Sequence, residues 1–228
     1  MGKDHLKRIA TPKTWPIARK ANTFVMRPQS GKLMELSMPL GFVLKEVLGV
    51  AQTSKQVTAM LQAGRVVVDG VARKDKRYAV GLYDVIELVE AKKAFRIGIK
   101  ENGKLFPFEI DVKEANSKLL KITRKTLVKG GKMQVAFLNG RVVLVEDAKK
   151  YSVGDSIVMN EKNVIKKHLP FEKGSLVQLF GGRHMGVVAT IKEMDGQKII
   201  VEAQGSEFET LKQYGFVIGA KTEEVQVR

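Results

Sequence analysis

The sequence contains no cysteine among its 228 residues and only three histidines. Without cysteine there is no disulfide, thiolate zinc site or cysteine nucleophile, and this composition fits a reducing cytoplasm. His5, His168 and His184 are far apart in the chain, and none has carboxylates at the spacing of metal ligands. We therefore predict no metal site, no cofactor and no catalytic residue.

Long apolar runs are also missing. No segment approaches the roughly 20 apolar residues that a membrane-spanning helix needs, and the basic start lacks the apolar core of a signal peptide. Neither glycine-rich nucleotide motif occurs, and the Gly pair between Lys129 and Lys132 has no helix pattern after it. We expect a cytoplasmic protein with no membrane partner, no anchoring signal and no small-molecule substrate.

Acidic residues are scarce, with 24 Asp and Glu against 40 Lys and Arg, which gives a net charge of +16. The excess is uneven: residues 1–32 carry +7 and residues 91–171 carry +10, whereas residues 33–90 sum to zero and residues 172–228 to −1. Such a balance predicts a polyanionic partner. Because no basic amphipathic helix accompanies it, RNA or DNA is favoured over a membrane surface.

Residues 1–38 are predicted to form a basic arm, because four prolines up to Pro39 interrupt any helix. A solvated tail is the common alternative, but Trp15 and Phe24 could stack on bases or pack on the body of the protein. We expect the arm to be disordered in the isolated protein, with Trp15 exposed, and to become ordered against RNA. Its candidate RNA contacts are Lys7, Arg8, Lys13, Trp15, Arg19, Lys20 and Arg27.

Two helices and a hairpin are predicted within residues 39–90. Apolar residues from Leu40 to Leu48 follow a helical period that Gly49 ends. Residues 53–56 have the Thr-x-x-Gln spacing of a capping box, and the helix that they start can end in a left-handed cap at Gly64. Residues 65–68 then read as a strand, the Asp69-Gly70 pair as a two-residue turn and residues 71–73 as the return strand.

This order of elements, with its Leu-Gly-Val-Ala-x-Thr-Ser-Lys and Ala-Gly-Arg-Val-Val-Val-Asp-Gly segments, resembles the S-four-type RNA-binding domain. The resemblance implies that the second helix, its leading turn and the following strand edge grip structured RNA. Lys55 stands where arginine is common, and would contact phosphate as a point charge; Asp69 stands where asparagine is common. The implied contacts are Thr53, Ser54, Lys55, Arg65, Arg73, Lys74, Lys76 and Arg77.

Residues 91–171 are predicted to form an all-β domain. Phe95, Ile97 and Ile99 alternate with other residues, the Asn102-Gly103 pair predicts a turn, and a second alternating run follows to Ile110. Further turns are predicted at residues 130–131, 139–140 and 154–155, with strands at 133–137 and 141–145. Turns at these intervals are typical of a small barrel or sandwich.

Residues 172–228 contain a glycine-rich segment, residues 173–188, that resembles the KOW motif of SH3-like barrels. Gly181, Gly182 and Gly186 would let the backbone approach a partner closely. We predict contacts through Gly181, Gly182, Arg183 and His184; the low charge of this region leaves open whether it faces protein or RNA.

Overall, the chain is predicted to be a multidomain α+β protein, and its order of parts is similar to the archaeal and eukaryotic small-subunit ribosomal protein family S-four-e. That resemblance implies a non-catalytic structural component of the cytoplasmic ribosome, bound to ribosomal RNA and neighbouring small-subunit proteins. Two alternatives stay open. One is a KOW-type transcription or translation factor, and the other is an RNA-modifying enzyme, for which the catalytic constellation is not found.

Overall fold

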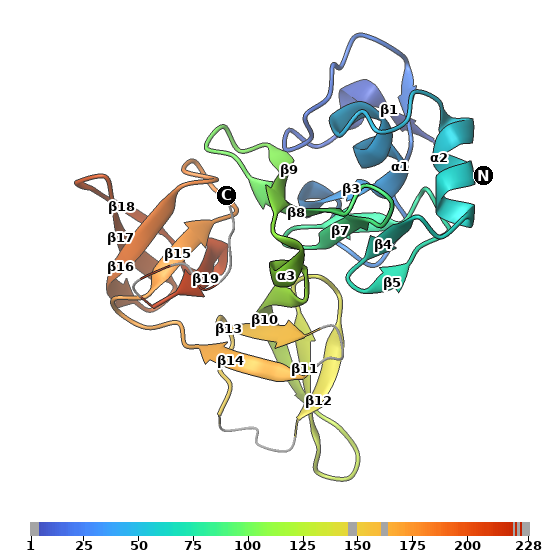
Figure 1. The fold of residues 1–228 in the computed structure, drawn as a ribbon. Helices are drawn as coiled ribbons and strands as arrows, with labels where there is room; N and C mark the ends of the chain where they lie inside the picture. The colour runs from blue at the N-terminus through green and yellow to red at the C-terminus, as the bar shows by residue number, and fades with distance from the viewer. Residues whose placement is uncertain (1–4, 146–149, 161–163, 221, 223, 225–228) are drawn as a thin grey trace. The chain divides into compact units, whose positions relative to one another are not determined.

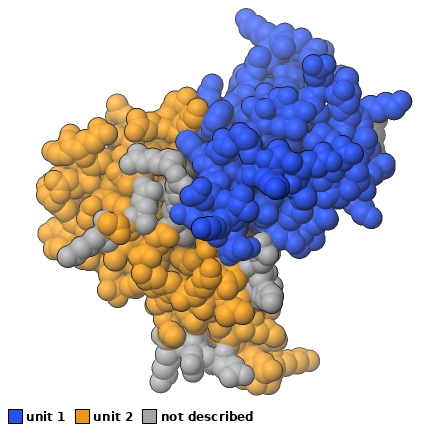
Figure 2. All heavy atoms as spheres, viewed as in Figure 1, with its two compact units in different colours: residues 1–98, 104–116 blue, residues 99–103, 117–228 orange. Residues whose placement is uncertain are grey.

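The structure is a computed structural model that describes residues 5–145, 150–160, 164–220, 222 and 224. The chain is mostly β-strand with a few short helices, in agreement with a multidomain α+β protein (Figure 1). It divides into two compact units, one formed by residues 1–98 and 104–116 and the other by residues 99–103 and 117–228 (Figure 2). The four-part division at residues 38, 90 and 171 stays a prediction.

The first predicted helix is present as α1 (Leu40–Phe42), which continues into a π-helical turn, η3 (Val43–Val47). The amide of Leu48 donates to the carbonyl of Val43 at 2.8 Å, and Gly49 then takes a φ of +67°. Positive φ at the first residue after a helix strongly favours glycine. Leu40, Val43 and Leu44 of the predicted stripe are fully buried.

Helix α2 (Ser54–Gln62) begins with the predicted capping box. The Thr53 hydroxyl accepts from the amide of Gln56 at 3.2 Å, and the Gln56 side chain accepts from the amide of Thr53 at 3.0 Å. Val57 and Leu61 are buried on one face of the helix, and Gly64 has the left-handed φ of +71°. The start, the end and the inward face of this helix are therefore as predicted.

The main sheet of the first unit has the strand order β5-β4-β7-β8-β9. It contains β4 (Val66–Val68), β5 (Val71–Ala72), β7 (Val85–Leu88), β8 (Lys93–Ile99) and β9 (Leu105–Ile110). The β4–β5 turn has φ values of +50° at Asp69 and +75° at Gly70, as the predicted two-residue hairpin requires. Because β8 pairs with β7, the predicted boundary near residue 90 falls inside this sheet.

Residues 5–38 are packed within the first unit instead of forming an extended arm. Strand β1 (Leu6–Lys7) pairs with β2 (Phe24–Val25), and the short helix η1 (Arg8–Ala10) follows β1. Helix η2 (Met34–Leu36) leads into β3 (Ser37–Pro39), which pairs with β6 (Ala79–Gly81). Pro12, Pro16 and Pro28 break the chain into short pieces, as predicted, but the pieces are packed.

The second unit begins with a five-stranded sheet in the order β12-β11-β10-β13-β14. Its strands are β10 (Ser117–Leu127), β11 (Met133–Phe137), β12 (Val142–Val145), β13 (Ser156–Asn160) and β14 (Ile165–Leu169); the short helix α3 (Val112–Ala115) precedes β10. Ile122, Val135, Phe137, Tyr151 and Ile157 form its buried core. The strands predicted between the turns, at residues 133–137 and 141–145, are therefore present as β11 and β12.

A second five-stranded sheet in this unit has the order β18-β17-β16-β15-β19. It contains β15 (Leu176–Leu179), β16 (Val188–Asp195), β17 (Lys198–Ala203), β18 (Ser206–Leu211) and β19 (Gly215–Gly219), with the turn η4 (Lys212–Tyr214) before β19. Val177, Leu179, Ile191, Ile199 and Val201 are buried. The glycine-rich segment joins β15 to β16.

Candidate nucleic-acid interface

The first predicted contact region is the start of α2, where Thr53, Ser54 and Lys55 are all exposed. The capping box holds this turn in one conformation, because it satisfies two backbone amides with side chains of the same turn. Lys55 therefore extends from a fixed backbone, and its ammonium can reach a phosphate without any rearrangement of the helix.

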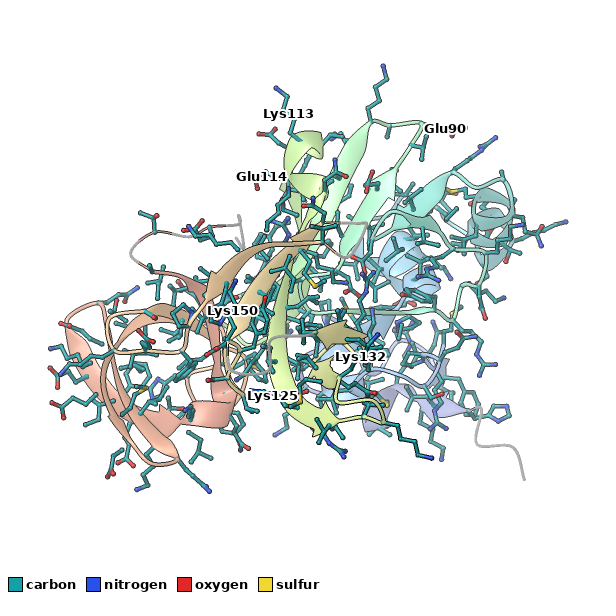
Figure 3. The ribbon with its side chains drawn as sticks, turned by 90° about the horizontal axis from the view of Figure 1, so that it is seen from below. Glu90, Lys113, Glu114, Lys125, Lys132 and Lys150 are labelled. Atoms are coloured by element: carbon teal, nitrogen blue, oxygen red, sulfur yellow. The ribbon has the colours of Figure 1, made fainter. Side chains whose placement is uncertain are left out.

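The second region is the start of the hairpin, where Arg65 is exposed and follows the left-handed Gly64. Its Nε lies 2.9 Å from a carboxylate oxygen of Glu90, which lies in the β7–β8 turn (Figure 3). Both side chains are about half exposed or more, and an ion pair of this kind contributes little to stability. If an RNA phosphate replaced Glu90 as the partner of Arg65, the loss of the ion pair would therefore cost little free energy.

The third region is the connection after β5, where Tyr78 organises the cations. The Arg73 guanidinium lies 4.4 Å from the centre of the Tyr78 ring, and the Lys32 ammonium lies 5.2 Å from it. Lys74 is exposed, whereas Lys76 and Arg77 are half-buried. Sequence reasoning placed Arg73, Lys74, Lys76 and Arg77 together, and the structure adds Lys32, which is 41 residues before Arg73.

Lys32 is anchored by an ion pair with Asp84, whose carboxylate is fully buried and also accepts from the amide of Gly81 at 2.7 Å. Burial alone acts to lower the pKa of Lys32, but the charge of Asp84, followed by Tyr78 and Asp69, outweighs it and raises the pKa. Lys32 therefore stays charged. The only sequence signal for it was its place among the basic residues of the arm.

Two of the predicted arm contacts are structural in this conformation. Arg8 is 5 % exposed, and its guanidinium donates to Glu46 at 2.6 Å and to the carbonyl of Ala18 at 3.1 Å. Trp15 is 1 % exposed; its ring packs against Phe42, and its indole N–H donates to the carbonyl of Met34. The predicted exposure of Trp15 is therefore corrected, because its surface is taken by the protein's own core.

Arg19 also has structural partners, since it donates to the carbonyls of Ile9 at 3.0 Å and Pro12 at 3.2 Å. Lys7, Lys13 and Lys20 are exposed, and Arg27 is half-buried. The basic side chains available at the surface of this segment are thus fewer than its composition suggests.

In the glycine-rich segment, two of the glycines are required by the chain's own packing. A Cβ on Gly181 would overlap the ring of Tyr214, and one on Gly186 would overlap the backbone carbonyl of Lys100. The His184 ring stacks on Phe208 with centroids 4.1 Å apart, and Arg183 is exposed. Contacts within the protein therefore explain Gly181 and Gly186 without a binding partner. Arg183, in contrast, is exposed and can contact a partner.

Several cations of residues 91–171 are buried, which the charge count could not reveal. Arg96 is fully buried and donates to the carbonyl of Glu114 on α3 at 3.1 Å (Figure 3), and its burial lowers its pKa to about 10. Lys121 is 5 % exposed, and burial, followed by the charge of Lys212, lowers its pKa to about 7. The surface of this region is therefore less basic than the sequence suggests.

A small basic group near Tyr151 was not predicted individually. Lys125 of β10 donates to the carbonyl of Tyr151, and the Lys150 ammonium lies 5.9 Å from the centre of the Tyr151 ring. Figure 3 labels both lysines together with Lys132, which precedes β11 in the same unit. Lys150 and Tyr151 are neighbours in the sequence, whereas Lys125 is 26 residues before Tyr151, a contact that neither composition nor periodicity indicates.

The described residues also bear on metal sites and membranes. They contain no group of three or more His, Asp or Glu side chains that could hold a metal ion. Among the helices that the structure describes, none is long and apolar enough to cross a membrane.

Comparison with known proteins gives one consistent family. Residues 91–164 match the model of ribosomal family S4e, and residues 1–31 match that of the RS4NT domain. The chain is 36 % identical to small ribosomal subunit protein eS4 of Archaeoglobus fulgidus, over 95 % of this chain and 94 % of the relative. It is 37 % identical to eS4 of Methanococcus aeolicus, over 94 % of this chain and 93 % of that relative.

A solved structure agrees with these relatives. The crystal structure of the 30S ribosomal protein S4e from Thermoplasma acidophilum superposes with a TM-score of 0.70 and 26 % identity, covering 81 % of this chain and 96 % of that one. Because the sequence relatives span almost the whole chain, the protein belongs to the ribosomal S4e family.

Proposed function

We propose that this protein is a structural constituent of the small ribosomal subunit that binds ribosomal RNA and supports subunit assembly and translation. The observation that carries the proposal is membership of the S4e family over nearly the full chain. The relatives reported above are ribosomal proteins, which favours this function over a KOW-type transcription or translation factor. Neighbouring small-subunit proteins are its further partners.

The main RNA-binding face consists of the start of α2 and the hairpin that follows it, within the helix-helix-hairpin region that we interpret as an S4-type RNA-binding domain. Its support is geometric: α2 begins with exposed Thr53, Ser54 and Lys55, and the hairpin that follows presents Arg65. Charged donors on a preorganised backbone fit the phosphates of structured RNA, which are recognised mainly by position and shape.

The C-terminal sheet is interpreted as a KOW-type SH3-like barrel that adds a smaller contact. Arg183 is exposed beside the His184–Phe208 stack, so this loop can present one charge and one ring edge to RNA. In the N-terminal segment, exposed Lys7, Lys13 and Lys20 remain the candidates. We retain residues 39–90, 91–171 and 172–228 as the functional parts that follow the segment of residues 1–38.

Sedimentation of a cell lysate tests the proposal. The tagged full-length protein is expected to travel with small subunits through a sucrose gradient and to stay there at moderate salt. A position at the top of the gradient, or with RNA polymerase, would overturn it.

A pair of charge reversals tests the RNA-binding face itself. Lys55→Glu with Arg65→Glu should strongly reduce incorporation into small subunits, because two phosphate contacts become repulsions. The matched control is Lys45→Glu with Lys113→Glu, which reverses two exposed charges of the same unit outside the face. Equal incorporation of both folded variants would place the binding face elsewhere.

A further inference from the structure

A cavity of about 620 Å³ lies in the first unit, between the segment after β2 and the connection that precedes β6. We call it the Arg27–Arg77 pocket. It is lined by residues 27–30, Lys32, Met34 and Arg77. Arg27 and Arg77 are 50 residues apart in the sequence, so only the fold brings them to one cavity.

The walls of this pocket are tied together by hydrogen bonds of the protein itself. The amide of Gln29 donates to the carbonyl of Arg77 at 2.8 Å, and the Gln29 side chain donates to Asp75 at 2.6 Å. The other oxygen of Asp75 accepts from the amide of Arg77 at 2.7 Å. The two segments therefore hold their spacing without a ligand, and such preorganisation lowers the entropy cost of binding.

Lys32 forms a fixed part of the wall, because its ammonium is paired with the buried carboxylate of Asp84. The pocket thus combines this anchored lysine with two arginines, each of which also has an interaction within the protein. Among the described residues that line it there is no carboxylate, and Pro28 and Met34 add apolar surface.

This combination suits one ligand chemistry. One guanidinium group can bind two phosphate oxygens at the same time, and it can also stack on the face of a base. The apolar surface of Pro28 and Met34 within a mostly polar lining, and a volume within the range of small-molecule sites, suit a flat heterocycle that carries polar groups. We propose that the Arg27–Arg77 pocket receives an unstacked nucleotide from a single-stranded stretch of the bound RNA. The inference rests on the proposed RNA-binding function and adds a specific nucleotide-binding site to it.

A duplex would not use the pocket in this way, since its bases are stacked and only its phosphates reach the protein surface. The pocket therefore separates two kinds of RNA contact on this unit. The start of α2 and the hairpin meet the backbone of structured RNA, whereas the pocket holds one base and its phosphate from an unpaired segment.

Photocrosslinking with the full-length protein tests nucleotide binding in the Arg27–Arg77 pocket directly. The probe is a 12-nucleotide mixed-sequence RNA in which 4-thiouridine replaces uridine, and the crosslinked peptides are identified by mass spectrometry. We expect peptides that contain residues 27–34 or Arg77. If the probe binds but crosslinks only to other segments, the pocket does not hold a nucleotide, and the proposed RNA-binding function is unaffected. Failure of this probe and of a 16-base-pair RNA duplex to bind would overturn both.

Two variants and a control separate stacking from charge. Ser30→Leu narrows the pocket without a change of charge and should weaken binding of the 12-nucleotide RNA about tenfold, in line with the loss of one stacked base. It should leave duplex binding unchanged. Arg77→Gln should weaken single-strand binding and reduce its salt slope by about one.

The control is Lys45→Gln, which removes one exposed charge of the same unit away from the pocket lining. It should leave the affinity for the 12-nucleotide RNA nearly unchanged. If Ser30→Leu binds the single strand as well as the unaltered protein does, the pocket does not hold a base.

Discussion

Gly186 lies directly against the backbone carbonyl of Lys100, so that a Cβ added at Gly186 would overlap the carbonyl oxygen and carbon. The amide of Gly186 also donates to the carbonyl of Leu179 at 2.7 Å. Neither the Lys100 carbonyl nor the Gly186 amide can move away without breaking backbone interactions. The glycine is therefore required by the contact as well as by its φ of +93°.

Gly186→Ala should lower the free energy of unfolding by about 1–3 kcal/mol more than Gly205→Ala, because overpacking adds to the strain of positive φ. Gly205 is the matched control: its φ is +78°, and a Cβ there would have no heavy atom within 4 Å. Denaturant unfolding of both variants measures the difference. Equal losses would show that only backbone strain matters at residue 186.

Arg8 and Lys7 are neighbours in sequence with opposite environments, and their substitutions should have opposite effects. Arg8→Gln should lower the free energy of unfolding by about 1–3 kcal/mol, because it removes a charged hydrogen bond to Glu46 and another to the carbonyl of Ala18, both made by a buried guanidinium. Lys7→Gln should leave stability unchanged but reduce the salt slope of RNA binding by about one. Chemical denaturation and salt titration distinguish them, and a loss of stability in the Lys7 variant would contradict the assignment.

Trp15 is the only tryptophan of the chain, so its fluorescence reports the N-terminal segment alone. In the isolated protein its emission should be blue-shifted and weakly quenched by iodide, because the indole is 1 % exposed. Trp15→Ala should cost about 3–5 kcal/mol of stability. Strong quenching, or early proteolysis near residue 15, would show instead that the segment is exposed until RNA binds.

Lys121 should make stability depend on pH. Its ammonium donates to the carbonyl of Gln213 at 2.8 Å and to that of Gly215, and it lies 5.0 Å from the Phe180 ring centre. Burial lowers the pKa of Lys121 from 10.5 to about 7. Between these values the unfolded chain binds more protons than the folded one, so the free energy of unfolding should rise with pH above 7, by at most about 1.4 kcal/mol per unit from this group.

Urea unfolding at pH 7, 8 and 9 measures the effect. Lys121→Met keeps an apolar side chain in the same space and removes the titrating group, so the rise that Lys121 causes should disappear in this variant. An identical slope in both proteins would assign the pH dependence to other groups.

Structural features that depend on residues close together in the sequence were predicted correctly. The capping box joins Thr53 to Gln56, the turn at Asp69 and Gly70 needs only their own dihedral angles, and β11 shows its alternation within five residues. Each of these features depends on contacts a few residues apart. The exposed positions at the start of α2 follow from the same local order.

Long-range features were not predictable in this way. Strand β8 could pair with β7 or with the strands that follow it, since its alternation is the same in either sheet. The partners of Arg8 and Lys32 are 38 and 52 residues away. The Arg27–Arg77 pocket likewise depends on a contact between segments that no periodicity connects.

The order of residues was enough to predict the capping box of α2, the turn between β4 and β5 and the basic character of the protein, because hydrogen bonds between near neighbours and backbone dihedral angles are local. The three-dimensional packing of the chain determines which cations reach solvent. In a count of charges, Arg8, Arg96 and Lys121 do not differ from any other basic residue, but the fold buries them. Burial depends on which distant segments meet, and the resulting desolvation makes these three residues part of the folded core while Lys55 and Arg65 stay at the surface.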